Sequence, residues 1–179
     1  NLGTFTTTVA TTKTMTAAAN VVAGKTIDKA GTGALAVQIA TADATVDLTT
    51  IAGSALSTIT VTDNVTFTGT LDDAVKTSVN GTKTLTIAAA KANGKTIDGA
   101  GNVAVTALDA TAAANLSSIT NSGTRTAAVS DNVTFTGNLG TFTTTVASTK
   151  TLTAAASVVN GKTIDGAGNV AVTALDATA

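Results

Sequence analysis

The chain is built from copies of one sequence unit, and this repetition limits its possible folds more than any other feature. Gly-Lys-Thr-Ile-Asp occurs at residues 24–28, 94–98 and 161–165. Asp-Asn-Val-Thr-Phe-Thr-Gly occurs at residues 63–69 and 131–137, and the first ten residues return at 138–147. The last two copies of the first string are 67 residues apart, the copies of the second are 68 apart, and those of the third are 137 apart, or two units. Repetition at a fixed period favours an extended array in which each unit contacts only its neighbours.

These copies divide the chain into unit one at residues 1–69, unit two at 70–137 and a partial unit three at 138–179. We expect the three to form one continuous array. Because the sequence opens and stops inside a unit, it has the character of a processed chain or of a window from a longer repetitive protein.

The composition excludes several classes of function. No Cys, His, Glu, Pro, Trp or Tyr is present, and Thr makes up roughly a quarter of the 179 residues. Without Cys there are no disulfides and no thiolate metal sites. A formal net charge of −1 gives no basic surface for nucleic acid, and no apolar run is long enough to span a membrane. With no His, Cys or Glu to activate a nucleophile, we expect no enzymatic activity and no catalytic residue.

Local patterns predict an all-β protein. Apolar and polar residues alternate at 83–87, 102–106 and 132–136, as expected for strands with one buried face. Asn-Gly pairs at 80–81, 93–94 and 160–161 supply turns between such runs. The alanine-rich stretch 88–92 is only about one helical turn long, which is marginal for a helix in isolation.

Two architectures accommodate a β repeat of this size. In a parallel β-solenoid (β-helix), each 67–68-residue repeat forms about three stacked coils, and residues 83–102, 103–124 and 125–149 are the predicted coils of the second unit. Its narrow interior suits Leu, Val, Ile, Ala and inward-facing Thr. The alternative is a string of small β-sandwich repeats, but units of this size with so few aromatic residues bury little apolar surface. The sequence favours the solenoid.

The phrases Lys-Thr-Leu-Thr-Ala-Ala-Ala at 150–156 and Val-Val-Asn-Gly-Lys-Thr-Ile-Asp-Gly-Ala-Gly at 158–168 resemble repeats of giant bacterial surface proteins. These are the β-strand-repeat adhesins and related filament- or S-layer-forming proteins. The resemblance covers essentially the whole chain and rests on composition and cadence. It implies an exported protein of the bacterial cell surface or extracellular matrix, involved in attachment, biofilm or surface coating.

One weak candidate metal site emerges from the repeats. Asp98 and Asn102, and their equivalents Asp165 and Asn169, present oxygen atoms on Gly-rich loops of a kind that Ca²⁺ prefers. The favoured interpretation is a tight turn in which Asp and Asn hydrogen-bond their own backbone. We therefore expect no cofactor, with calcium as the alternative.

Four other motifs have a structural interpretation that we prefer. The three Gly-Lys-Thr strings lack the upstream glycine of a phosphate-binding loop and predict a turn before a strand, with the Lys on the solvated face. The acidic pair Asp72-Asp73 does not recur in the other units. Asn64 and Asn132 match the glycosylation sequon at equivalent positions, and we expect them to interact between coils at a corner. Thr-x-Thr pairs are spaced too irregularly for the regular threonine face of an ice-binding solenoid.

The sequence therefore predicts a structural segment of a secreted bacterial filament or matrix protein that associates with itself, head-to-tail or laterally. The first alternative is the stalk of an adhesin that presents a separate binding domain. The second is an ice-binding solenoid. A cell-surface or carbohydrate layer is a further candidate partner.

Overall fold

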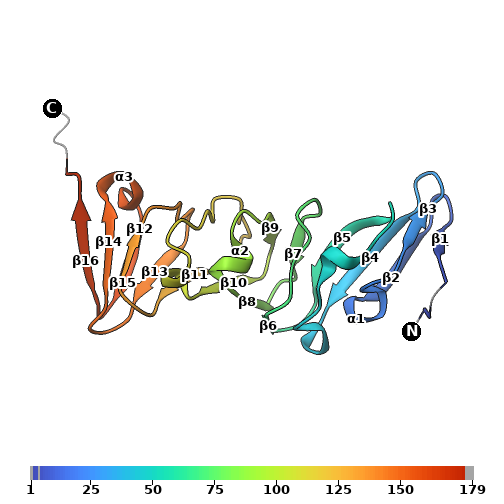
Figure 1. The fold of residues 1–179 in the computed structure, drawn as a ribbon, viewed down its shortest axis with the longest axis horizontal. Helices are drawn as coiled ribbons and strands as arrows, with labels where there is room; N and C mark the ends of the chain where they lie inside the picture. Colours follow the sequence, from blue (N-terminus) through green and yellow to red (C-terminus); the bar gives the residue numbers. More distant parts are fainter. Residues whose placement is uncertain (1, 4, 176–179) are drawn as a thin grey trace.

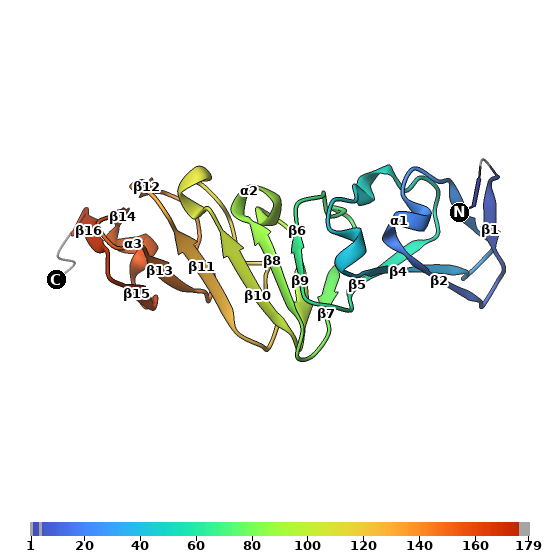
Figure 2. The ribbon, with the colours of Figure 1, turned by 90° about the horizontal axis from the view of Figure 1, so that it is seen from below.

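In the computed structural model, which describes residues 2–3 and 5–175, the chain forms an elongated array of parallel strands (Figures 1 and 2). All strand pairings are parallel, so the all-β prediction is confirmed and the sheets are of the parallel kind. The strands are β1 (Thr7–Val9), β2 (Thr14–Ala18), β3 (Ile27–Lys29), β4 (Ala34–Ile39), β5 (Leu56–Val61), β6 (Val65–Phe67), β7 (Thr77–Val79), β8 (Thr84–Ala88), β9 (Ile97–Gly99), β10 (Asn102–Thr106), β11 (Arg125–Val129), β12 (Val133–Phe135), β13 (Thr143–Val146), β14 (Thr151–Ala155), β15 (Ile164–Gly166) and β16 (Asn169–Thr173).

The strands come in pairs that a short turn joins, and we call each such pair a layer: β1–β2, β3–β4 and so on to β15–β16. Each layer hydrogen-bonds to the next, because the chain returns to the same position after about 20 residues. Thr126 pairs with Thr143, 17 positions on, and Val103 with Arg125, 22 positions on. Three layers make up one sequence unit, as the repeat length predicts.

Every third layer steps sideways by one strand. Within unit one, β1 pairs with β3 and β2 with β4, but β5 then pairs with β4, so that β6 begins a new sheet. The same step recurs in unit two, where β11 pairs with β10 and β12 begins a new sheet. The four sheets are therefore β1-β3, β2-β4-β5-β7-β9, β6-β8-β10-β11-β13-β15 and β12-β14-β16.

The strand pairing corrects two predicted coil boundaries and excludes the string of sandwiches. A first coil at residues 83–102 would place Lys83 beside Val103, whereas Leu85 pairs with Val103. A third coil at residues 125–149 would place Lys150 beside Arg125, whereas Thr143 pairs with Thr126 and Leu152 with Val133. The predicted coil lengths were wrong because the spacing of segments along the sequence does not reveal which strand pairs with which. Parallel pairs β5–β7 and β11–β13 join one unit to the next, so the units are not separate sandwiches.

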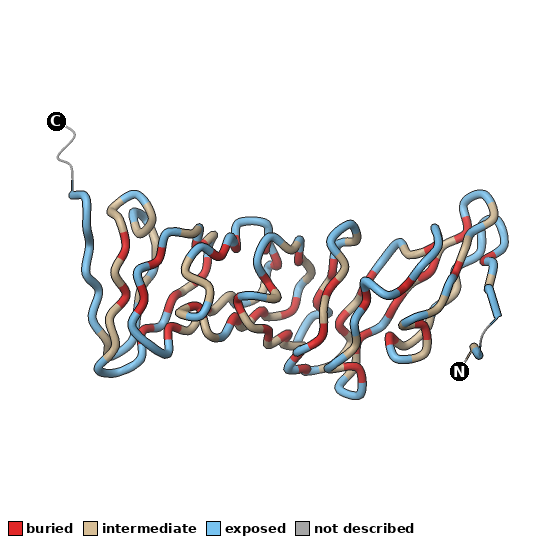
Figure 3. Tube along the Cα trace, viewed as in Figure 1, coloured by how far each residue is buried: buried red, intermediate tan, exposed pale blue. Residues whose placement is uncertain are grey.

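Along most strands buried side chains alternate with half-buried or exposed ones, and the buried ones form one continuous narrow core (Figure 3). Three of the four Phe residues are fully buried, and the rest of the core is mainly Leu, Ile, Val and Ala. Inward-facing Thr was predicted, and Thr77 and Thr144 are indeed buried at equivalent positions of β7 and β13. Small side chains thus fill the space between layers.

Short helices and close glycine contacts turn the chain between layers. The one-turn helices α1 (Ala19–Val22), α2 (Ala89–Ala92) and α3 (Ala156–Val159) occupy equivalent positions, and α1 and α2 each bury two apolar side chains. Gly69 and Gly137 follow β6 and β12, where an added Cβ would lie 2.0 and 2.1 Å from a backbone oxygen of the preceding layer. Glycine is required there because the chain passes directly against its neighbour. The remaining short elements are 3₁₀ turns at Thr41–Asp43, Leu48–Thr50 and Leu108–Ala110.

The turns within layers differ from the Asn-Gly prediction. At residues 80–83 the left-handed conformation belongs to Thr82, at φ 66°, and not to Gly81. Its equivalents Thr12 and Thr149 have φ 63° and 66°. A β-branched residue is strained in this region, so each unit holds one strained turn of the same kind.

The identical segments 1–10 and 138–147 provide a matched test of the core. Phe142 is 1% exposed whereas Phe5 is 80% exposed, because only Phe142 has a preceding layer to pack against. We expect Phe142→Ala to lower the free energy of unfolding by about 3–5 kcal/mol and Phe5→Ala to change it little. Urea denaturation measures both, and equal losses would contradict the packing described.

Relief of the strained turn is expected to stabilise the chain. Replacing Thr149, at φ 66°, by Asn puts a residue that tolerates this conformation in its place. The free energy of unfolding should rise by about 1 kcal/mol, measured by urea denaturation. The same change at exposed Thr145 in β13, where the backbone is extended, serves as the control and should bring no gain.

Candidate functional site

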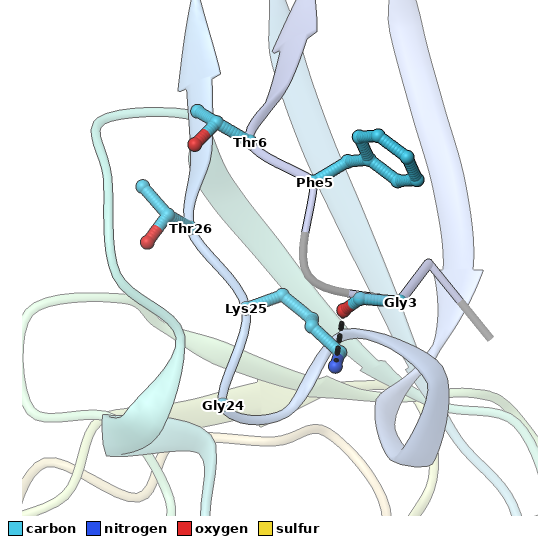
Figure 4. A pocket seen from close by; sticks show the side chains of 6 residues that line it. All are labelled: Gly3, Phe5, Thr6, Gly24, Lys25 and Thr26. Carbon is cyan, nitrogen blue, oxygen red and sulfur yellow. Dashed lines mark hydrogen bonds between the residues drawn. The ribbon is translucent and has the colours of Figure 1, made fainter.

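The repeated Gly-Lys-Thr strings lie at one corner of the array and line two similar hollows. Gly3, Phe5, Thr6, Gly24, Lys25 and Thr26 line the first (Figure 4). Gly140, Thr141, Phe142, Gly161, Lys162 and Thr163 line its equivalent in unit three. The glycine of each string has a left-handed backbone, with φ between 66° and 71°, which confirms the predicted turn.

The lysines of these strings bind the preceding layer. The Nζ atom of Lys25 donates to the Gly3 carbonyl at 2.7 Å, as the dashed line in Figure 4 marks, and Lys162 donates to the Gly140 carbonyl at 2.6 Å. Lys95 donates to the Leu71 carbonyl at 2.9 Å and pairs with Asp73, and its side chain is only 11% exposed. The prediction of a solvated lysine was therefore wrong for Lys95. The ammonium groups are used to join layers and do not point at an open phosphate site.

The candidate calcium ligands mostly have partners within the chain. Asp98 in β9 forms an ion pair with Lys76 at 2.6 Å. The Oδ1 atom of Asn102 accepts the Thr124 N–H at 2.8 Å. Asp165 accepts the neighbouring Gly166 N–H at 2.6 Å, as in the predicted turn, and Asn169 begins the exposed strand β16. Among the described residues no three acidic side chains come together in a metal-binding group.

A recurring asparagine contact joins successive layers. Asn64 Oδ1 accepts the Thr84 N–H, and Asn132 Oδ1 accepts the Thr151 N–H, both at 2.8 Å. With the Asn102–Thr124 bond this makes three copies of one arrangement, which we call the Asn–Thr clamp. The expected role of Asn64 and Asn132 between layers is confirmed, although their partner is a backbone N–H and not another Asn. In each clamp the Asn side-chain oxygen accepts a backbone N–H at the start of a strand, in addition to the hydrogen bonds between the strands themselves.

An aspartate precedes two of these asparagines and pairs with a lysine of the next layer. Asp131 contacts Lys150 at 2.9 Å, and Asp63 lies 3.9 Å from Lys83. The hydrogen bonds from Lys150 and from the Asn132 N–H lower the pKa of Asp131 below its ordinary value. The Thr41 hydroxyl and the Asn64 N–H do the same to the pKa of Asp63. Each ion pair ties the last layer of one unit to the first layer of the next.

The acidic pair Asp72-Asp73 is divided between two structural tasks. Asp72 Oδ1 accepts the N–H groups of Ala74 and Val75 at 2.8 and 2.9 Å, which closes a turn. Asp73 pairs with Lys95. The two carboxylates thus bind different neighbours, which suits two structural roles better than division into an acid and a base.

Threonines align in single columns. Thr66 pairs with Thr86 and Thr134 with Thr153, so each Thr-x-Thr pair overlaps the next by only one residue. The layer that follows β8 presents Asn102 and Ala104 in place of threonine. A doubled, regular threonine face is therefore interrupted.

A buried carboxylate was not among the residues predicted from the sequence. Asp43 is 1% exposed, and its two oxygens accept the N–H groups of Asn20 and Ala40, both at 2.9 Å. Asp109, at the equivalent place in unit two, accepts the Ser130 N–H at 2.6 Å. The repeated Asp-Ala-Thr at 43–45 and 109–111 is the signal that could have revealed this link between layers.

The ion pairs predict a dependence of stability on pH. A carboxyl with a lowered folded-state pKa stabilises the fold above its unfolded value, and this contribution is lost as the pH falls through the folded-state pKa. For Asp131 the loss should therefore begin below about pH 4. The urea midpoint should fall less between pH 7 and pH 3 in Asp131→Asn than in the parent chain. Asp165→Asn makes the same charge change at a carboxylate that no lysine in the described part of the chain contacts, and it should keep the parent profile.

The calcium alternative has a direct test. Because Asp98 and Asn102 already bind chain neighbours, we expect the melting temperature to be the same with added Ca²⁺ and with a chelator. A rise in melting temperature with Ca²⁺ that Asp98→Asn abolishes would contradict this expectation, since a ligand that binds only the folded state stabilises it.

No family model matches the chain, and neither a curated protein nor a solved structure is similar to it. None of the helices in the described part of the chain is long and apolar enough to cross a membrane. What the protein does must therefore be argued from how its layers are joined.

Proposed function

We propose that the chain is a structural segment, a parallel β-solenoid whose stacked layers form a rod. It would serve as filament, stalk or matrix material of a secreted bacterial surface protein. The observation that carries this proposal is that hydrogen-bonded sheets cross both unit boundaries, through β5–β7 and β6–β8 and through β11–β13 and β12–β14. A continuous ladder of backbone hydrogen bonds along the long axis would make the rod both stiff and long.

The side chains support the same role. The Asn–Thr clamps, the Asp–Lys ion pairs and the lysine-to-carbonyl bonds all join neighbouring layers. In an enzyme such polar groups would line a binding pocket, whereas here they form hydrogen bonds and ion pairs between layers. The secreted location and the bacterial surface are inferred from the resemblance to β-strand-repeat adhesins.

Deletion of one unit tests the proposal. Removing residues 70–137 joins Gly69 to Asn138 and recreates the Gly137–Asn138 junction, because residues 63–69 and 131–137 are identical. Three layers at about 4.8 Å each should be lost, so the rod should shorten by about 14 Å and still unfold cooperatively. Small-angle X-ray scattering measures the length. Deletion of residues 70–127 stops ten residues short of a full unit, joins Gly69 to Ala128 out of phase with the repeat, and is the control.

A compact particle, or beads joined by flexible hinges, would overturn the proposal. Oriented fibres of the chain supply a second measurement, since layers stacked along the rod should give an axial reflection near 4.8 Å. A stalk that carries a separate adhesive domain would have the same rod and the same reflection. The two roles differ in whether the rods join one another to form filaments, as we propose, or remain single.

A further inference from the structure

Two Asn-Gly pairs, at residues 80–81 and 93–94, lie in exposed turns in the middle of the array. In such a pair the backbone nitrogen of Gly can attack the side-chain carbonyl carbon of the preceding Asn, because Gly has no side chain to hinder the approach and adopts many backbone conformations. The attack needs a carboxamide and an N–H that are both free to move. Since the two pairs have the same sequence and both are exposed, their reactivity depends on what each group binds.

The next layer holds both groups of the pair Asn93-Gly94. The Asn93 Oδ1 atom accepts the Asn115 N–H at 2.8 Å, and the Gly94 N–H donates to the Asn115 carbonyl at 2.9 Å. For the Gly94 nitrogen to reach the Asn93 side-chain carbon, both hydrogen bonds must break. The contact between layers therefore protects this pair.

The pair Asn80-Gly81 has no such protection. Its turn is closed by the Lys83 N–H, which donates to the Asn80 backbone carbonyl at 3.1 Å. Within the described part of the chain, neither the Asn80 carboxamide nor the Gly81 N–H has a hydrogen-bond partner. The fold does not require Asn-Gly here either, because Ala10-Thr11 and Ala147-Ser148 occupy the equivalent turns, which the same bond closes at 3.0 and 3.1 Å. Both reacting groups are thus free at this turn.

We propose that Asn80 is a site of spontaneous deamidation. The Gly81 nitrogen forms a bond to the Asn80 Cγ atom, the Cγ–Nδ2 bond breaks, and ammonia leaves with the proton that the Gly81 nitrogen gives up. Water then opens the resulting cyclic imide at either of its two carbonyl carbons. Opening at one carbon gives aspartate, and opening at the other gives isoaspartate, in which the chain runs through the side chain of residue 80. The sum is one water consumed and one ammonia released, with no oxidant or cofactor.

The two products affect the stack of layers differently. The Asn80 carbonyl oxygen lies directly against the next layer, only 2.3 Å from where a Cβ atom on Gly101 would be. Isoaspartate removes this carbonyl from the peptide chain and so opens the turn that the Lys83 N–H closes, next to the pairing of β7 with β9. Aspartate keeps the backbone and adds one negative charge at an exposed position. The isoaspartyl product therefore loosens the joint between two layers, whether or not the rod has the function proposed above.

Peptide mapping by mass spectrometry tests the proposal, with Asn93 as the control in the same molecule. The folded chain is kept at neutral pH, and the conversion of amide to carboxyl is followed at both sites over time. Asn80 should react roughly thirtyfold faster than Asn93, the effect of the two hydrogen bonds that hold Asn93-Gly94. In urea strong enough to unfold the chain, the two sites should react at similar rates, because both pairs are then free.

Two variants separate the reaction from its consequence. Gly81→Ala should slow the loss of the Asn80 amide and keep the fold, because the added Cβ atom would meet the Ala100 Cβ at 3.6 Å, an ordinary contact. Asn80→Asp reproduces the aspartyl product and should keep the urea midpoint of the parent, whereas the isoaspartyl fraction purified from aged chain should have a lower one. Equal rates at Asn80 and Asn93 in the folded chain, or a difference that persists in urea, would overturn the site. An isoaspartyl fraction as stable as the parent would overturn the loosened joint.

Discussion

The structure depends on backbone hydrogen bonds that run from each layer to the next along the long axis. Because the chain returns to the same place after about 20 residues, every strand in the described part of the chain has a parallel neighbour on at least one side, and those inside a sheet have one on both sides. The narrow core fills the space that this winding leaves, so side chains need only be small and apolar. A composition rich in Thr and Ala, with four Phe, is enough for such an interior.

The sideways step of every third layer explains why the sequence repeats in units longer than one layer. The string Asp-Asn-Val-Thr-Phe-Thr-Gly lies at this step in both complete units. Its Asp and Asn bind the Lys and Thr that begin the second strand of the following layer, and its Gly turns against the layer before. One sequence unit therefore encodes three layers and one sideways step.

Local features were predictable from the sequence, and relations between distant strands were not. Alternating residues at 83–87 and 102–106 identified β8 and β10, and the equivalence of Asn64 with Asn132 identified a contact between layers. The step was missed because pairing β11 with β13 or with β14 is equally compatible with their patterns. The left-handed Thr82 and the buried Asp43 were missed for a similar reason, since tertiary contacts override the local preference of each residue.

The step also governs how two such arrays could lie side by side. The equivalent strands β8 and β14 belong to different sheets, and β2 belongs to a third, so any surface feature of a unit moves by one strand in the same direction with each repeat. In a longer array, equal residues would follow a diagonal path like the thread of a screw. A straight neighbour could then match such residues only at intervals, which opposes flat bundling of parallel arrays.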